Sequence, residues 1–446
     1  MLTRDQAQAL AAKVLSYSTF PECFVSISSS EQAFTRFANN GITTAALVSR
    51  HSVAISVTRE GRTGTTTVND LEDGILKESV ARAEALAAIA PPNPEHGTPL
   101  GKQEYPETND YDEKTALARA PEMIPQIRAV IETSRKQKLV AAGLFERQTT
   151  NSAIANKAGL FGFHRSADSK LTTTVRMADG SSSGWAGLPS TRIAEISGEN
   201  LAATAAQKCA RWKNPRKLDP GKYTVVFEPT ATGDIVHLLV GGFFGQAFSA
   251  RAAEEGRTFL SKKGGGTLQG EKMFPDYITL RTDPFDPRLP ATPWTGDELP
   301  TRKVNWIDKG VVANLAVDRY WATKTNKQPT PGLTSLILDG GDASLADLIK
   351  SVDRGLLVTH FWYIRFVNTQ TQQYTGLTRD GLFLIEKGEI SEPVMNFRFN
   401  DGPVGLMKNA VKLGKVSRMR GLEGASMVAP ALVSADFNFT SISDAV

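Results

Sequence analysis

One histidine of this chain stands at the start of a spacing that could carry zinc chemistry. His237 lies in an apolar run, and a His-Glu-x-x-x-His box beginning there would need glutamate at position 238 and histidine at position 242. The chain has Leu238 and Gly242 at these positions. A catalytic zinc needs three protein ligands and an open position for water, and the glutamate would be the base for that water. With one ligand and no base, we expect neither a metal nor a catalytic residue in this box.

The other histidines do not supply a helical metal site. No two of the five histidines have i, i+4 spacing. Even an intact box would need help from the fold, because five residues turn an ideal helix by about 500° and leave the two ligands about 140° apart. His164 and His360 each end an apolar run, which is typical of structural histidines. An alternative is that the fold brings His360 and an acidic residue, Glu254 or Glu255, to His237 in a non-standard site beside a substrate cavity.

Two glycine-rich segments match catalytic loops only in part. Residues 180–184 have the Gly-x-Ser-x-Gly pattern of a nucleophile elbow, which needs a helix directly after it. Residues 185–189, Trp-Ala-Gly-Leu-Pro, cannot start a regular helix, so we interpret the segment as a Ser-Gly turn. Residues 262–266 lack the Gly-Lys-Ser/Thr ending of a phosphate loop, and we predict a glycine loop there.

The composition is that of an ordinary globular protein. Of 446 residues, 41% are hydrophobic and 22% are charged, so we expect two or three domains with a large core. The net charge is +4 with scattered basic residues, which disfavours a nucleic-acid partner. Cys23 and Cys209 are too few for a disulfide framework. The N-terminus has no secretion-signal pattern and no run of about 18 apolar residues is present, so we expect a cytoplasmic protein without membrane contact.

Caps, turns and periodicity predict the elements that would position these residues. Thr3 and Gln6 have capping-box spacing and predict an opening helix. Two strand-like runs flank Arg59-Glu60-Gly61 and predict a hairpin. Further helices are predicted at 70–90, 113–137 and 192–209, and further strands at 23–28, 139–149, 158–166, 170–178 and 223–227.

We therefore predict an α+β protein. Its N-terminal half is of α/β type, with helices beside a twisted antiparallel sheet. Its C-terminal half is mainly antiparallel β and barrel-like, with the box helix packed against it, because many short strands with Gly and Pro turns follow residue 275. The predicted divisions are an α+β subdomain at 1–90, a linker or surface loop at 91–112, a middle α+β subdomain at 113–217 and the barrel-like domain at 218–446.

Several segments resemble the TldD/PmbA family, whose members are also described as modulators of DNA gyrase. Residues 34–42, FTRFANNGI, resemble an N-terminal strand motif, and residues 247–259, AFSARAAEEGRTF, follow the box helix as they do in the family. The most specific likeness lies at the C-terminal end, in residues 359–367, 373–390 and 393–399. The likeness covers nearly the whole chain.

The resemblance implies a site that this chain lacks. Active members of the TldD type are zinc peptidases, with two histidines and a glutamate from the helix box and a cysteine near the C-terminus. Carried over residue by residue, only His237 remains, because Leu238 and Gly242 replace the other two and residues 420–424 contain no cysteine. This pattern is similar to the TldE (PmbA) branch, which pairs with the catalytic subunit.

The resemblance leaves three hypotheses for function. The first is a non-catalytic subunit that forms a heterodimer with a TldD-like subunit, holds no zinc itself, and helps to degrade or trim peptides. The second is an autonomous metal-dependent peptidase of the same family that uses a non-standard site. The third is a peptide-binding homodimer without chemistry.

Overall fold

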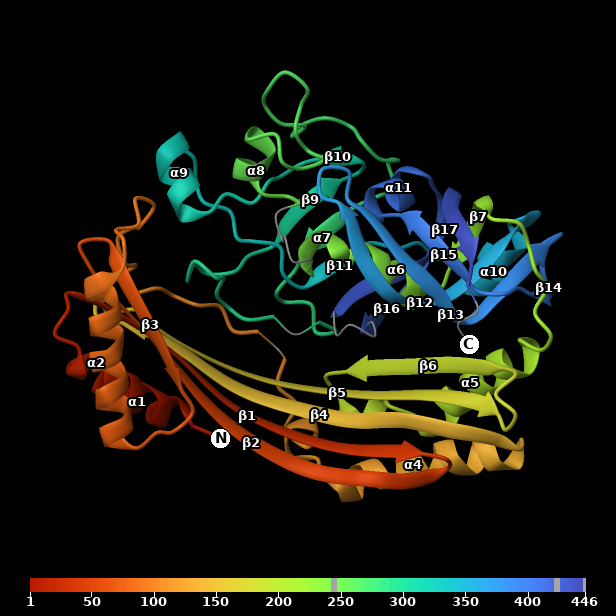
Figure 1. The fold of residues 1–446 in the computed structure, drawn as a ribbon, viewed down its shortest axis with the longest axis horizontal. Helices are drawn as coiled ribbons and strands as arrows, with labels where there is room; N and C mark the ends of the chain where they lie inside the picture. Colours follow the sequence, from red (N-terminus) through yellow and green to blue (C-terminus); the bar gives the residue numbers. More distant parts are fainter. Residues whose placement is uncertain (109, 242–246, 290, 421–425, 444–446) are drawn as a thin grey trace.

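The computed structural model describes residues 1–446 apart from 109, 242–246, 290, 421–425 and 444–446. Two sheets built from the two halves of the chain lie against each other (Figure 1). The contact between them includes strand β6 of the first sheet, Ser183–Ser190, against β13, Gln373–Glu386, and β16, Ala410–Arg420. The predicted α+β fold is confirmed.

The N-terminal sheet is antiparallel and has the strand order β3-β2-β1-β4-β5-β6. Its other strands are β1 Glu22–Ala38, β2 Gly41–Arg59, β3 Arg62–Val68, β4 Leu139–Asn156 and β5 Phe161–Met177. The predicted hairpin is confirmed, because β2 and β3 pair across a turn in which Glu60 and Gly61 both have positive φ. Strands β1 and β4 also pair directly, so segments on both sides of residues 91–112 belong to one sheet.

Helices cover one face of this sheet in two places. The helices are α1 Arg4–Tyr17, α2 Asp73–Ile89, α3 Glu113–Leu117, α4 Ala120–Lys136 and α5 Gly198–Arg211, with a 3-10 turn at Ile193–Glu195. The predicted Thr3–Gln6 capping box begins α1. Odd-numbered residues of β1 face the helices: Val25 and Ile27 pack with α1 and α2, and Ala33 and Phe37 pack with α4 and α5.

The C-terminal sheet of eleven strands contains a closed ring. Strand β7 pairs in parallel with β12 and antiparallel with β17, which closes the path β17-β15-β13-β12-β7. The predicted barrel-like architecture is therefore confirmed. The strands not yet bounded are β7 Gly221–Phe227, β8 Leu280–Thr282, β9 Val304–Asp308, β10 Val311–Val312, β11 Leu336–Leu338, β12 Arg354–Asn368, β14 Glu389–Pro393, β15 Phe397–Asp401 and β17 Ser426–Ile442.

The box helix packs into the core of this second domain. Helix α6, Pro229–Val236, contributes Ala231 and Ile235 to a cluster that contains Phe227, Phe361 and Phe437. The remaining helices are α7 Leu238–Gly241, α8 Ala250–Glu254, α9 Arg319–Thr325, α10 Leu345–Lys350 and α11 Pro403–Lys408. In the described part of the chain, the helices are all too short or too polar to span a bilayer.

Candidate functional site

The box at 237–242 forms the junction of two helices. His237 caps the C-terminal end of α6, and its Nδ1 donates to the carbonyl oxygen of Gly233 over 3.1 Å. Leu238 is buried in the C-terminal core. The phenol of Tyr374 donates to the carbonyl oxygen of Leu238 over 3.2 Å, which ties this turn to β13. Gly242 lies outside the described residues, as do positions 421–424 of the segment 420–424 that would correspond to the family cysteine.

The described residues of the box do not fit a catalytic zinc. Among the described box residues His237 is the one with a metal-binding side chain, its Nδ1 donates to the carbonyl oxygen of Gly233, and the neighbouring position presents an apolar side chain to the core. The nearest acid on the helix, Asp234, accepts from the backbone N–H of Phe361 over 3.0 Å and is itself buried. Within the part of the chain that the structure describes, no three His, Cys, Asp or Glu side chains are grouped so that they could hold a metal.

The two glutamates considered as cavity residues lie in surface ion pairs at α8. Glu254 accepts from the indole of Trp321 over 3.1 Å and from Lys327 over 2.7 Å. Glu255 pairs with Arg251 and Arg257, and the hydrogen bonds from these arginines lower the pKa of its carboxyl group. The fold does not bring either glutamate to His237 as a metal ligand.

His360 lies on the other side of the barrel wall from the box helix. Its neighbour Phe361 packs on the α6 side, and alternate residues of a strand face opposite sides of a sheet. His360 is fully buried, with its ring 4.8 Å from the ring of Trp185 on β6. The sequence hypothesis that placed His360 beside a substrate cavity together with His237 does not match this position.

Asp380 joins His360 to the N-terminal domain. One carboxylate oxygen lies 3.2 Å from Nε2 of His360, and the other accepts from the hydroxyl of Ser183 over 2.5 Å. Burial alone would raise the pKa of Asp380, but the hydrogen bond and charge of His360, with the Ser183 hydroxyl and the charge of Arg379, outweigh it and hold that pKa below its ordinary value. Because the serine binds the acid and not the imidazole, the histidine cannot take the serine proton, and the trio connects two domains.

The serine segment itself is the turn that the sequence predicts. Gly180 has φ +74°, and β6 follows directly at Ser183 without a helix. The hydroxyl of Ser182 donates to the carbonyl oxygen of Cys209 over 2.5 Å. Both serine hydroxyls therefore have structural partners, and the Gly-x-Ser-x-Gly pattern is no nucleophile elbow.

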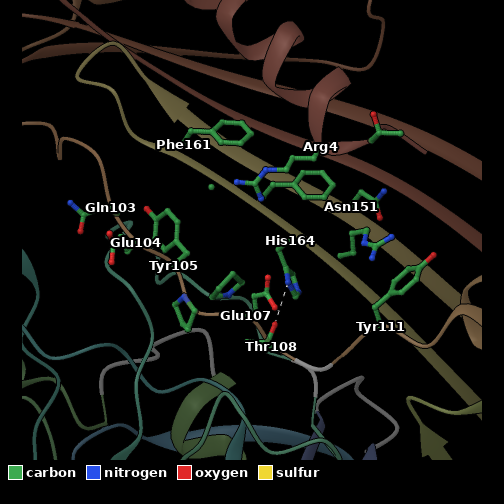
Figure 2. A pocket seen from close by; sticks show the side chains of 16 residues that line it. Arg4, Gln103, Glu104, Tyr105, Glu107, Thr108, Tyr111, Asn151, Phe161 and His164 are labelled. Carbon is green, nitrogen blue, oxygen red and sulfur yellow. Dashed lines mark hydrogen bonds between the residues drawn. The ribbon is translucent and has the colours of Figure 1, made fainter.

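A cavity lies beside the N-terminal sheet, lined mostly by residues of the N-terminal half. It has a volume of about 750 Å³ and lies between residues 103–108 and 110–111, which we name the strap, and the strands β4 and β5 (Figure 2). The strap contributes Tyr105 and Tyr111, and β5 contributes Phe161 and His164. None of the residues proposed from sequence as cavity residues lies here.

His164 is held by strap residues at both ring nitrogens. Its Nε2 lies 3.0 Å from a carboxylate oxygen of Asp110, and the hydroxyl of Thr108 lies 3.3 Å from Nδ1 (Figure 2). The same oxygen of Asp110 accepts from the backbone N–H of Ala291 over 3.1 Å. An anionic acid favours a proton on Nε2, which leaves Nδ1 to accept from the hydroxyl. From the sequence, His164 is predicted to be structural, and residues 91–112, which include the strap, are predicted to be a linker or surface loop.

Tyr105, which lines the cavity, packs against Trp294. The rings of Tyr105 and Trp294 meet edge to face, 5.4 Å apart, and the Tyr105 phenol donates to the carbonyl oxygen of Glu298 over 2.7 Å. Burial raises the pKa of Tyr105, so the phenol remains a donor. The sequence offers one signal for this cavity, which is two tyrosines in a Pro-rich loop without periodicity. This signal does not predict where the loop is anchored, because the strand that it packs on is known only from the fold.

Comparison with known proteins adds both a sequence and a structural likeness. Residues 220–441 match the family model of the PmbA/TldA metallopeptidase C-terminal domain. TldE from Thermococcus kodakarensis superimposes with a TM-score of 0.84 at 20% identity, covering 98% of this chain and 100% of that one. A candidate modulator of a DNA gyrase from Thermotoga maritima gives 0.84 at 18%, covering 97% and 100%. Another from Bacteroides thetaiotaomicron gives 0.79 at 21%, covering 99% and 100%. Comparison with curated proteins returns no match.

Proposed function

This chain belongs to the TldD/PmbA family, and we propose that it is the non-catalytic, TldE-like subunit of a metallopeptidase complex that degrades or trims peptides. In this proposal the zinc and its base belong to a TldD-like partner in a cytoplasmic heterodimer. This chain completes the cavity of the complex and holds peptide for the partner.

One observation carries the proposal: the position of the catalytic base is part of the hydrophobic core. Leu238 belongs to the same cluster as Phe227 and Phe361, and its carbonyl is held by Tyr374. A glutamate at this position would put a charge into that core, which costs several kcal/mol unless the charge is paired. The local packing thus suits a structural junction and opposes a return to zinc chemistry by this helix.

A mixing experiment tests the proposal. The purified chain would be combined with a TldD-like homologue that has an intact His-Glu-x-x-x-His box, and peptide hydrolysis would be followed with zinc present. We expect a stable complex that is active, and no hydrolysis by this chain alone. Hydrolysis by the isolated chain that His237→Ala abolishes would overturn the proposal and favour the autonomous peptidase. A homodimer that binds peptides and ignores the homologue would favour the third hypothesis.

A further inference from the structure

The cavity beneath the strap lies along an unpaired stretch of strand edge. Strand β5 extends from Phe161 to Met177, but β6 pairs with it only between positions 169 and 176. The backbone N–H of Ala167 leaves the sheet on this side and donates to the carbonyl oxygen of Asp110 over 2.8 Å. Every second residue of a strand points its backbone groups the same way. Phe161, Phe163 and Arg165 therefore point theirs to the open edge.

The strap runs beside this stretch, and the chain joins the sheet at both ends of it, where Gly101 bridges Gly159 and Asp110 accepts from Ala167. Among the backbone hydrogen bonds of the described chain, none joins residues 161, 163 or 165 to the strap or to β6. All three residues line the cavity. An open edge presents ready donors and acceptors to another extended chain, and the space beside it is already hollow.

From this geometry we propose that an extended peptide binds here as an added strand, antiparallel to β5 and in line with β6. This inference rests on the proposed function for its biological role, because it gives this subunit its own peptide-binding site. Three outward-pointing residues of β5 suit a peptide of about five residues, since a strand rises about 3.4 Å per residue.

The two faces of the edge differ in charge and shape. On the helix-covered face, the Arg4 guanidinium lies 5.4 Å from the Phe161 ring and that of Arg165 lies 4.2 Å from the Tyr111 ring. Neither arginine forms a salt bridge with a described residue. On the other face, Tyr105 packs so closely on Gly162 that an added Cβ would lie 2.8 Å from its ring.

These faces predict the peptide. In an antiparallel pair, residues directly opposite share a face, so the peptide residues that point their amides at β5 also point their side chains to the arginine face. Acidic side chains at alternate positions would meet Arg4 and Arg165, and the positions between them would be uncharged because Glu104 and Glu107 also line the cavity. The partner is therefore an extended peptide with alternating acidic residues.

The probe is acetyl-Val-Glu-Val-Glu-Val-amide with a fluorescent label, titrated into the full chain alone. N-methylation of both glutamate amides removes the donors that would face β5, and N-methylation of the second and third valine amides removes donors that would face away. We expect the glutamate-methylated peptide to bind at least tenfold more weakly than the parent, and the valine-methylated peptide to bind within about threefold of it.

A charge variant tests whether acidic side chains of the peptide are recognised by Arg165. Arg165→Gln should weaken the parent peptide about tenfold, whereas Arg128→Gln, an equal charge change on an exposed position of α4, should leave binding unchanged. Absence of saturable binding at millimolar peptide, or equal weakening by both methylation patterns, would overturn the inference. Because the partner subunit is absent from these titrations, their failure is separate from a failure of the proposed complex.

Discussion

Two histidine–aspartate pairs in this molecule each contact a neighbouring hydroxyl group, but they differ in whether the hydroxyl contacts the aspartate or the histidine. In the pair between the domains, Ser183 donates to the acid and the imidazole of His360 is fully buried. In the pair beneath the strap, the third group is Thr108, which lies against the imidazole of His164, and that side chain is 10% exposed at a cavity. The same two residue types thus join the domains where both acid oxygens are satisfied, and line a cavity where the imidazole is partly exposed.

Substitution of the acid in the buried pair, His360 with Asp380, should have the largest effect on stability. Asp380→Asn removes the charge that satisfies both Ser183 and His360 in a buried place, so we expect a loss of about 3 kcal/mol in the free energy of unfolding. Denaturant unfolding measures this loss. The exposed substitution Asp342→Asn should change stability by less than about 0.5 kcal/mol. Equal effects of the two substitutions would contradict a joining role for Asp380.

In the pair beneath the strap, His164 with Asp110, neutralising the acid should lower the free energy of unfolding by less. Asp110→Asn is expected to lower the free energy of unfolding by about 1.5 kcal/mol, because one oxygen of Asp110 has no partner among the described residues and His164 is partly exposed. The same denaturant experiment applies. A loss as large as that of Asp380→Asn would show that the strap pair is also a structural joint, and the comparison would fail.

Removing the hydroxyl group from each pair should also destabilise the pair between the domains more than the pair beneath the strap, although both losses should be smaller. Ser183→Ala leaves a buried acid oxygen without its donor and should cost about 1 kcal/mol, whereas Thr108→Val at the cavity should cost less than about 0.5 kcal/mol. Thermal unfolding compares the two variants at one pH. The reverse ranking would assign the structural role to the strap.

The pH dependence sharpens the comparison further. The folded pKa of Asp380 lies below its ordinary value of 3.8, so its contribution to stability is complete above that value and is lost as the pH falls through the lower, folded pKa. Between pH 5 and pH 3 the wild-type protein should therefore lose more stability than Asp380→Asn, with urea midpoints as the measurement. Parallel losses in both proteins would show that Asp380 titrates alike in the folded and unfolded states.

Much of the fold could be predicted because local signals carried it. The Thr3–Gln6 cap begins a helix, and the turn at Glu60-Gly61 joins two strands as its residue types indicate. The pairing of β1 with β4 could not be predicted, since their register depends on contacts more than a hundred residues apart in the chain. For this reason the sequence predicts a division at residues 91–112, whereas the strands β1 and β4 on its two sides pair with each other.

Some features of the candidate site could likewise be predicted from the sequence, and others could not. The loss of the zinc box could be predicted from the residue types at Leu238 and Gly242 alone, because a missing ligand or base is visible in the sequence itself. The position of His360 was not visible, since strand alternation turns it away from the helix that follows β7. The strap cavity was not visible either, because its walls come from α1, two loops and two strands that meet only in the folded protein.

By itself, then, the sequence determined which chemistry this chain lacks, through residue types at fixed spacing, and which local elements form, through caps, turns and periodicity. Only the tertiary structure decided which histidines acquire partners and which strand edge stays open. Hydrogen bonds such as those of Asp380 and Asp110 join residues that are distant in the chain, so their formation depends on how whole elements pack and not on any local pattern.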